Sequence, residues 1–338
     1  MTHVKATILG AGGWGITLAN LCHSVDLSVV LWEFDPDAAD KLRRTRVRDE
    51  VLPGVKVHRE VAITHELGEA VKASRFIFLV VPSHVVRPVL RSLNKVTMAG
   101  EAILVNCTKG LEIETHKRIS ELVREELVRF DFDNYVVLSG PSHAEEVSKS
   151  IPTAVVVASN DPKKAKAVQK SLNTPVFRLY TSRDVIGVEI GGALKNIIAI
   201  AAGICDGAGF GDNTKAALLP RGLAEIVRLG RKAGADPLTF SGLSGMGDLV
   251  ATCMSRHSRN RYVGEQIGKG RTLADVLAGM TMVAEGVKTC KAAKRLAGKL
   301  LVEMPICHQV YKVLFNGKDP KQAMQDLMTR KVKSEIWY

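Results

Sequence analysis

Residues 4–15 read Val-Lys-Ala-Thr-Ile-Leu-Gly-Ala-Gly-Gly-Trp-Gly, an apolar stretch that runs straight into a group of glycines. This pattern predicts a strand over 4–9, a tight turn, and a helix over 16–23. A second apolar run at 28–32 predicts the next strand, and Glu33 follows it. A strand, a glycine turn, a helix, a second strand and a terminal acid form the setting in which the pattern G-x-G-x-x-G binds a dinucleotide.

The glycines of this turn have distinct expected roles. Gly10 permits the tight turn, Gly12 lets the backbone approach a pyrophosphate, and Gly15 lets the helix pack closely on the strand. The N-terminus of the helix would then present backbone N–H groups and the positive end of its dipole to the phosphates. The alternative is a glycine-rich turn in a similar fold that binds a different ligand.

Glu33 bears on the choice of cofactor. A carboxylate at the end of the second strand accepts hydrogen bonds from a ribose 2′-hydroxyl and repels a 2′-phosphate. The sequence therefore favours NAD over NADP. Lys41, Arg43 and Arg44 are the nearest basic residues and could soften this preference, so NADP binding stays possible.

Further apolar runs alternate with helical stretches up to about residue 183. They are typical of a largely parallel sheet covered on both faces. Beyond that point the pattern is helical to the C-terminus. The expected fold is therefore α/β: a doubly wound, Rossmann-type domain over residues 1–185, followed by an all-α domain over residues 186–338. The runs lie at 75–81, 102–106, 135–138 and 153–158.

Lys195 is the only charged residue between Glu189 and Asp206. A helix that is apolar on all sides is normally buried, and burial lowers the pKa of an ammonium group. Such a lysine can donate and accept a proton near neutral pH. The small neighbours Gly191 and Gly192 are expected to leave room beside the amine for a ligand. The alternative is a lysine that reaches out to solvent at a helix end.

The composition narrows the class of protein. The 338 residues suggest two domains, and the net charge of +12 fits attraction of small anions better than nucleic-acid binding, because no nucleic-acid motif accompanies the basic run at 41–48. The sequence shows no signal peptide, and none of its apolar runs is long enough to predict a membrane span. The six scattered cysteines are typical of reduced thiols in a cytosol, and no metal-binding cluster is evident.

Four polar segments are expected at loops or helix starts. Ser142 and Glu145 have the spacing of a capping box, which would place a helix N-terminus at the ligand. Arg259 offers a planar fork of donors and Asn260 an amide, which suit a phosphate group. The segments are Cys107-Thr-Lys-Gly110, Ser139-Gly-Pro-Ser-His-Ala-Glu145, Ser244-Gly-Met-Gly-Asp-Leu249 and Ser255-Arg-His-Ser-Arg-Asn-Arg261.

Taken together, the sequence resembles the NAD(P)-dependent glycerol-3-phosphate dehydrogenases of the soluble bacterial type, over essentially its whole length. Many motifs in the same order make the resemblance specific. They are Gly10 to Gly15, Thr108 to Gly110, Ser139 to Ser142, Gly192 to Asn196, Gly209 to Thr214, Pro220 to Glu225, Gly247 to Leu249, Ser258 to Arg261 and Val283 to Gly286.

The resemblance implies reversible hydride transfer between a nicotinamide and C2 of glycerol 3-phosphate, which interconverts it with dihydroxyacetone phosphate. It also implies a cytoplasmic homodimer that supplies glycerol 3-phosphate for phospholipid synthesis. Lys195 matches the general acid/base, with Lys109 and Asp248 beside it in the catalytic group. The implied substrate-binding residues are Lys109, Gly140, Ser142, Asn196, Asp248, Ser258, Arg259 and Asn260. The implied cofactor-binding residues are Gly10, Gly12, Gly13, Trp14, Gly15, Glu33, Lys109, Ala144, Arg259, Val283 and Glu285.

Two positions depart from the family pattern. The family often has serine in place of Gly13, and many bacterial members have a basic or neutral residue in place of Glu33, which puts the usual NADPH preference in doubt. Several local alternatives stay open: Lys109 as a surface lysine, Asp248 or Ser258 as a helix cap, and His143 without an assigned role. The whole-protein alternatives are a related hydroxyacid dehydrogenase and a non-catalytic dinucleotide-sensing module.

Overall fold

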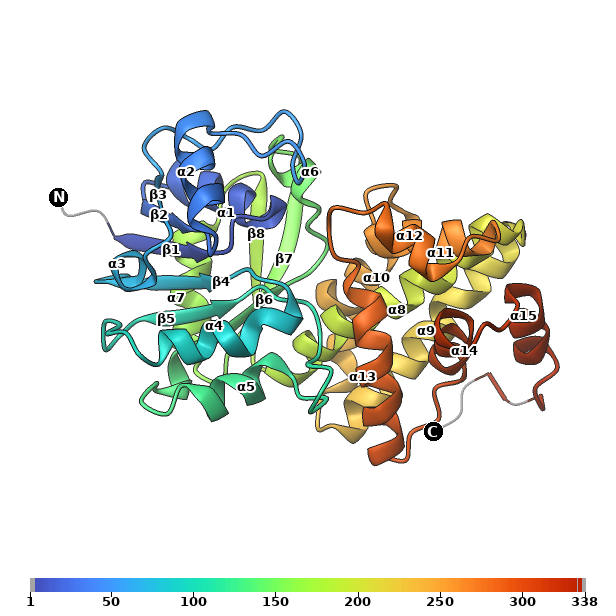
Figure 1. The fold of residues 1–338 in the computed structure, drawn as a ribbon. Helices are drawn as coiled ribbons and strands as arrows, with labels where there is room; N and C mark the ends of the chain where they lie inside the picture. The colour runs from blue at the N-terminus through green and yellow to red at the C-terminus, as the bar shows by residue number, and fades with distance from the viewer. Residues whose placement is uncertain (1–3, 333, 336–338) are drawn as a thin grey trace.

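The computed structural model describes residues 4–332, 334 and 335, and places a sheet part beside a helical part (Figure 1). Within those residues the sheet has eight strands in the order β3-β2-β1-β4-β5-β6-β7-β8. All neighbouring strands are parallel except β6 and β7, which are antiparallel. The strands are β1 (Lys5–Leu9), β2 (Ser28–Trp32), β3 (Ala62–Thr64), β4 (Phe76–Leu79), β5 (Ile103–Asn106), β6 (Tyr135–Ser139), β7 (Thr153–Ala158) and β8 (Phe177–Ser182).

Helices cover both faces of the sheet because residues on its strands are buried on both sides. One face packs on α1, α2 and α7, and the other on α3, α4, α5 and the start of α8. In β1, for example, Ile8 belongs to the first core and Leu9 to the second. The helices are α1 (Gly13–Ser24), α2 (Pro36–Thr45), α3 (Leu67–Val71), α4 (Val86–Leu93), α5 (Ile119–Glu126), α6 (Ala144–Val147) and α7 (Pro162–Leu172).

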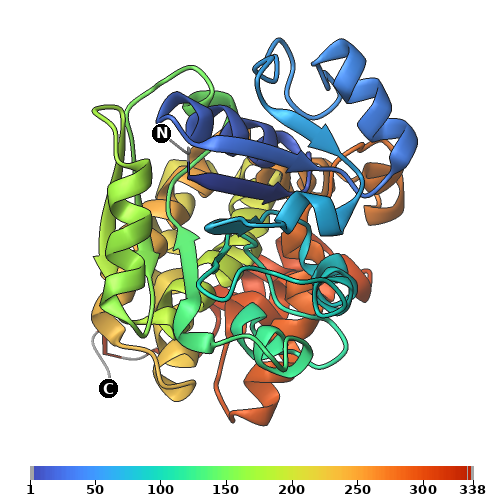
Figure 2. The same cartoon turned by 90° about the vertical axis from the view of Figure 1, so that its left-hand side faces the viewer.

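From Val185 onward every described regular element is helical, and these helices lie behind the sheet when the molecule is viewed from its sheet side (Figure 2). The predicted fold class is therefore confirmed. The α-helices are α8 (Val185–Ala208), α9 (Gly211–Lys232), α10 (Asp248–Met254), α11 (Arg259–Gly268), α12 (Leu273–Ala278), α13 (Glu285–Lys299), α14 (Pro305–Phe315) and α15 (Pro320–Met328). Before α10, a 3-10 turn (Pro237–Ser241) and a π-helical turn (Leu243–Gly247) precede Asp248.

The last strand ends at Ser182 and the long helix α8 starts at Val185. We propose the boundary between two domains here, at 185/186. The first turns of α8 belong to the sheet core through Val185 and Val188, whereas its later residues form the centre of the helical core. One continuous helix therefore joins the two parts. Residues 1–3 and 336–338, at the outer ends of the two predicted ranges, lie outside the described residues.

Helix α8 has the length and apolar character of a membrane-spanning helix: it has 24 residues and a mean hydropathy of 1.7 in its most apolar window. The expectation that this run is too short to span a membrane is therefore wrong. However, 94% of that window is buried inside the protein. Its apolarity reflects its place at the centre of the helical core.

Buried Glu189 of α8 ties the helical part to the sheet part. Its carboxylate accepts hydrogen bonds from the Ser120 backbone (2.8 Å) and the Tyr135 hydroxyl (2.7 Å), and Arg118 lies 3.1 Å away. Burial raises the pKa of Glu189, although Arg118 opposes the change. Because Lys195 lies six residues further along the same helix, this anchor also fixes the position of Lys195 relative to the sheet.

Glycines let α8 and α11 cross in close contact. A Cβ atom at Gly203 would lie 1.9 Å from the carbonyl oxygen of Arg261, and one at Gly264 would lie 2.0 Å from that of Ile200. These distances are too short for any side chain. The contact places the first turn of α11, with Arg259 and Asn260, alongside α8.

The Gly203→Ala substitution is therefore expected to destabilise the protein by about 1–3 kcal/mol or more, because the two backbones must separate. Gly298→Ala in α13 is the matched control, since a Cβ there would meet nothing within 4 Å. We expect the control to raise stability by about 0.5–1 kcal/mol. Equilibrium unfolding in denaturant measures both, and equal changes would contradict the close helix crossing.

Candidate active site

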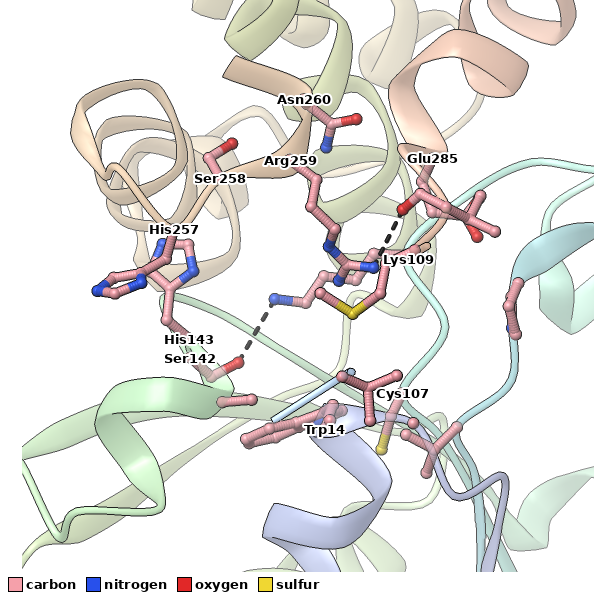
Figure 3. A pocket seen from close by; sticks show the side chains of 18 of the residues that line it. Trp14, Cys107, Lys109, Ser142, His143, His257, Ser258, Arg259, Asn260 and Glu285 are labelled. Carbon is pink, nitrogen blue, oxygen red and sulfur yellow. Dashed lines mark hydrogen bonds between the residues drawn. The ribbon is translucent and has the colours of Figure 1, made fainter. Parts of the chain in front are cut away.

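A cleft with a volume of about 360 Å³ lies between the sheet part and the helical part. Both parts contribute to its lining, and Figure 3 shows Trp14 on one side facing Arg259 and Asn260 on the other. Of the residues expected in the site, the cleft is lined by Gly12, Gly13, Trp14, Gly15, Lys109, Ser142, Ala144, Lys195, Asn196, Ser258, Arg259, Asn260, Val283 and Glu285. Gly10, Glu33, Gly140 and Asp248 lie outside this lining.

The glycine turn has the geometry that a dinucleotide requires. Gly10 has a φ of +114°, which side chains rarely tolerate, and a Cβ at Gly15 would lie 1.8 Å from the Gly10 carbonyl oxygen. A Cβ at Gly12 would meet nothing within 4 Å. The turn thus leaves open space in front of the N-terminus of α1, where a pyrophosphate would bind. These residues fit the cofactor implied by the sequence.

Lys195 is buried and held by two groups from α10. Its Nζ lies 2.8 Å from Oδ1 of Asp248 and donates a 2.6 Å hydrogen bond to the Thr252 hydroxyl. Only 7% of the Lys195 side chain is exposed, which rules out a lysine that reaches solvent. Asp248 and Thr252 are one helical turn apart, so both face α8.

Lys109 occupies the other side of the same carboxylate. Its Nζ lies 2.9 Å from Oδ2 of Asp248 and donates a 2.7 Å hydrogen bond to the Gly140 carbonyl oxygen. The hydroxyl of Ser142 is 3.5 Å away (Figure 3). One aspartate therefore binds two lysines, one through each oxygen. Asp248 is the first residue of α10, and its carboxylate binds these lysines. It does not act as the helix cap that the sequence left open as an alternative.

This arrangement sets the ionisation of the group. Burial lowers the pKa of Lys195 to about 8; Asp248 opposes the change and Lys109 adds to it. Burial alone would raise the pKa of Asp248, but the two lysines hold it below its usual value. At neutral pH, a charged Lys195 can thus donate a proton, and its neutral form is accessible at slightly higher pH.

The glycines beside Lys195 do not leave open space, in contrast to the expectation from the sequence. A Cβ at Gly191 would lie 2.6 Å from the Ser244 carbonyl oxygen, and one at Gly192 would lie 2.8 Å from the Ser139 hydroxyl. They instead let α8 approach the two segments that carry Asp248 and Gly140. The open space beside the amine belongs to the cleft.

Asn196 and Asn260 line the cleft but also hold its walls together. Asn196 donates to the backbone oxygen of Lys109 (3.2 Å) and accepts from Asn260 (2.9 Å). Asn260 in turn accepts from the backbone N–H of Gly286 (2.8 Å). The two amides thus connect the strand-end loop of Lys109 with α8, α11 and α13.

Two other residues expected in the site, Ser258 and Arg259, form hydrogen bonds with backbone groups of the helical part. The Ser258 hydroxyl accepts a hydrogen bond from the Arg261 backbone at 3.2 Å, so Ser258 caps α11. Arg259 extends across the cleft and donates to the Val283 carbonyl oxygen at 3.0 Å (Figure 3). The capping box expected at Ser142 is wrong: the short helix α6 starts at Ala144, and His143 precedes it without a side-chain cap.

Glu285 closes the cleft at the start of α13. Its carboxylate accepts hydrogen bonds from the backbone N–H (3.0 Å) and the hydroxyl (2.5 Å) of Ser83 in the sheet part. Ser83 and Thr252 were not found from the sequence. Thr252 could have been, because it follows Asp248 by four residues in a helix and must share its face.

Glu33 lies at the end of β2 as expected, with only 13% of its side chain exposed. Its Oε2 accepts a 2.6 Å hydrogen bond from Nη1 of Arg48. The same Nη1 donates to the carbonyl oxygen of Ala11, inside the glycine turn, at 3.2 Å. Arg48 belongs to the basic run at 41–48 and lies beyond the end of α2.

One group of His, Cys, Asp or Glu side chains among the described residues could hold a metal ion: His23, His58 and Glu60. This group was not predicted from the sequence, because His23 is distant in the chain from the other two residues. The imidazole rings of His23 and His58 stack with centroids 3.9 Å apart and an angle of 22° between them. Stacked rings do not direct their nitrogens at one point, so we assign no metal to this group. All six cysteines are buried and free.

Comparisons with known proteins identify the family of this chain. A family described as "NAD-dependent glycerol-3-phosphate dehydrogenase N-terminus" matches residues 5–165, and its counterpart, "NAD-dependent glycerol-3-phosphate dehydrogenase C-terminus", matches residues 184–325. A protein of Chlorobium phaeobacteroides named glycerol-3-phosphate dehydrogenase [NAD(P)+] is 50% identical, over 99% of this chain and 100% of the relative. A protein of Geobacter sulfurreducens with the same name is 51% identical, over 98% of each.

The fold is also that of a solved structure. The crystal structure of glycerol-3-phosphate dehydrogenase from Coxiella burnetii superposes with a TM-score of 0.92 at 35% identity, covering 97% of this chain and 99% of the other. The agreement extends through both the sheet part and the helical part. The chain therefore belongs to the NAD-dependent glycerol-3-phosphate dehydrogenase family.

Proposed function

We propose that this enzyme interconverts dihydroxyacetone phosphate and sn-glycerol 3-phosphate with NAD(P), and that Lys195 is its general acid/base. The observation that carries the proposal is the position of Lys195: a buried ammonium at the cleft between the two parts, with its pKa lowered to about 8. Reduction of a ketone builds negative charge on its oxygen. A buried ammonium stabilises that charge and then donates the proton.

The neighbours of Lys195 have separate roles in this proposal. Asp248 orients the amines of Lys195 and Lys109 through its two oxygens. Lys109 adds positive charge beside the developing oxyanion, which lowers the energy of the transition state. The Thr252 hydroxyl fixes the Lys195 amine by accepting its hydrogen bond.

The phosphate end of the substrate would be bound by the start of α11. Arg259 and Asn260 are the first two residues of this helix, so their backbone N–H groups lie at its N-terminus. The Arg259 guanidinium can add a forked pair of hydrogen bonds. Binding at this unreactive end holds the carbonyl carbon in place at the other end of the cleft.

The cofactor would be bound by the glycine turn, with its pyrophosphate at the N-terminus of α1 and Trp14, Ala144, Val283 and Glu285 along the cleft. When bound, its nicotinamide supplies or accepts the hydride. Glu33 favours NAD, as the ribose hydroxyls would meet its carboxylate.

An absorbance assay tests the activity. The protein is mixed with NADH and either dihydroxyacetone phosphate or a 2-oxo acid, and the reduced-nicotinamide band is followed. Loss of absorbance with the phosphorylated ketone alone is the expected result. Loss only with an oxo acid would support a hydroxyacid dehydrogenase, and no loss with either would support a dinucleotide sensor.

The two directions of the reaction are expected to respond oppositely to pH. Reduction needs the charged form of Lys195, so kcat should fall as pH rises through about 8. Oxidation needs the neutral amine, so kcat should rise over the same interval. Rate profiles from about pH 6 to about pH 10 in both directions measure this. Profiles that rise or fall together would contradict the role of Lys195.

We also propose that the enzyme works in the cytosol as a homodimer and supplies glycerol 3-phosphate for phospholipid synthesis. The family resemblance and the six free, buried thiols support this setting. Light scattering coupled to size-exclusion chromatography tests the dimer.

A further inference from the structure

Arg48 contacts Glu33, the carboxylate at the end of β2 that would meet the ribose of the adenosine half of a dinucleotide. It donates from one nitrogen both to Glu33 (2.6 Å) and to the carbonyl oxygen of Ala11 in the glycine turn (3.2 Å), and from Nε to Glu50 (3.2 Å). Only 26% of its side chain is exposed. These bonds fix a positive charge between the end of β2 and the turn that would hold the pyrophosphate.

The loop that carries Arg48 also forms part of the cofactor cleft. Val51, three residues further on, lines the cleft. A Cβ at Gly13 would lie 2.8 Å from the Val51 carbonyl oxygen, so this loop contacts the first turn of α1 directly. The position of Arg48 is therefore coupled to the cofactor site.

The ion pair changes the effect that Glu33 has on a bound 2′-phosphate. A lone carboxylate at this position repels a 2′-phosphate, whereas an arginine nearby accommodates one. Here both occur in contact, so the guanidinium offsets the charge of Glu33, while Glu50 also contacts Arg48 at 3.2 Å. The Arg48 guanidinium donates three hydrogen bonds, to Glu33, Ala11 and Glu50. A guanidinium has five N–H donors in all. Arg48 thus retains donors for a phosphate.

We propose that Arg48 is the residue that determines whether this enzyme accepts a 2′-phosphate, by binding that phosphate and by neutralising Glu33. The inference rests on the proposed cofactor site and deepens it. Removing Arg48 and removing the charge of Glu33 should shift cofactor choice in opposite directions. Loss of Arg48 leaves a bare carboxylate at Glu33 and favours NAD. Loss of the Glu33 charge leaves the guanidinium paired with exposed Glu50 alone and favours NADP.

Calorimetric titration with two probes tests this without turnover. Adenosine 5′-monophosphate and adenosine 2′,5′-bisphosphate differ only in the 2′-phosphate. Arg48→Gln is expected to weaken binding of the bisphosphate by about tenfold or more, since a charged hydrogen bond is lost, with little change for the monophosphate. Glu33→Gln is expected to strengthen binding of the bisphosphate. NADPH and NADH titrations should show the same two shifts.

Arg75→Gln is the matched control, because Arg75 also pairs with a glutamate, Glu101 at 2.7 Å, but does so just before β4, at the opposite end of the sheet from the glycine turn. It should leave the ratio of the two probe affinities nearly unchanged. An equal loss for Arg75→Gln, or an Arg48→Gln variant that loses both probes together, would overturn the role of Arg48. If the wild-type protein binds NADH but both variants keep the wild-type ratio of the two probe affinities, the role of Arg48 is wrong and the cofactor site still holds. If the wild-type protein does not bind NADH, both the cofactor site and the role of Arg48 are wrong.

Discussion

Lys195→Met is expected to lower kcat for ketone reduction by about 10²–10⁴-fold, the contribution typical of a positioned general acid. Methionine keeps most of the length and volume of the side chain but removes the proton and the charge. The affinity for NADH, measured by fluorescence titration, should change little because the glycine turn lies apart from the amine. The remaining rate should also lose the pH dependence expected near pH 8.

Lys215→Met is the matched control for burial. Lys215 is also a largely buried lysine in an ion pair, with its Nζ 2.6 Å from Asp206 and 12% of its side chain exposed. It does not line the cleft. We expect this variant to be less stable but to retain kcat. If Lys195→Met retains its rate, or if both variants lose kcat equally, the proton donor is another group.

Asp248→Asn is expected to have the second largest effect, because it removes the one negative charge that binds both lysines. Asp248 opposes the lowering of the Lys195 pKa, so its loss should move that pKa below about 8. The fall in reduction rate with rising pH should then begin at lower pH. We expect kcat at neutral pH to fall by about 10²-fold or more, as the ammonium is less populated and less well oriented.

The same substitution should destabilise the fold by about 3–5 kcal/mol, because buried Lys195 and partly buried Lys109 would lose their counter-charge. Asp206→Asn is the control, since Asp206 also joins two cations, Lys215 at 2.6 Å and Arg261 at 2.7 Å. It should lower stability without moving the pH profile. A pH profile that shifts in the control but not in Asp248→Asn would contradict the assigned role of Asp248.

The sequence was sufficient where the signal is local. A glycine at positive φ, an apolar strand buried on both faces, and a strongly apolar helix are each visible in a short window. For this reason the strands 28–32 and 153–158 coincide with β2 and β7. The fingerprint glycines and the position of Glu33 followed for the same reason.

Two strands were missed for different reasons. Strand β3 has only three residues, too few for any periodicity. Strand β8 alternates buried and exposed residues at the edge of the sheet, so it lacks the continuous apolar character of the central strands. Its Phe-Arg-Leu-Tyr pattern carried a period-two signal that could have identified it.

The contacts within the site could not be predicted from the sequence, because they depend on the tertiary structure. The sharing of Asp248 between two lysines joins residues 109, 195 and 248 from three separate elements. The pairing of Arg48 with Glu33 depends on how the loop after α2 folds back onto the glycine turn. No spacing in the chain encodes such contacts, which arise from packing between elements.

The central claim is that the Lys195 amine gives its proton to the carbonyl oxygen of a phosphorylated three-carbon ketone. A crystal structure of the enzyme with oxidised cofactor and dihydroxyacetone phosphate tests it most directly. We predict Nζ of Lys195 within hydrogen-bond distance of that oxygen, about 2.6–3.2 Å, with the phosphate at the start of α11. A substrate bound with its carbonyl oxygen away from Lys195 and against another proton donor would contradict the account.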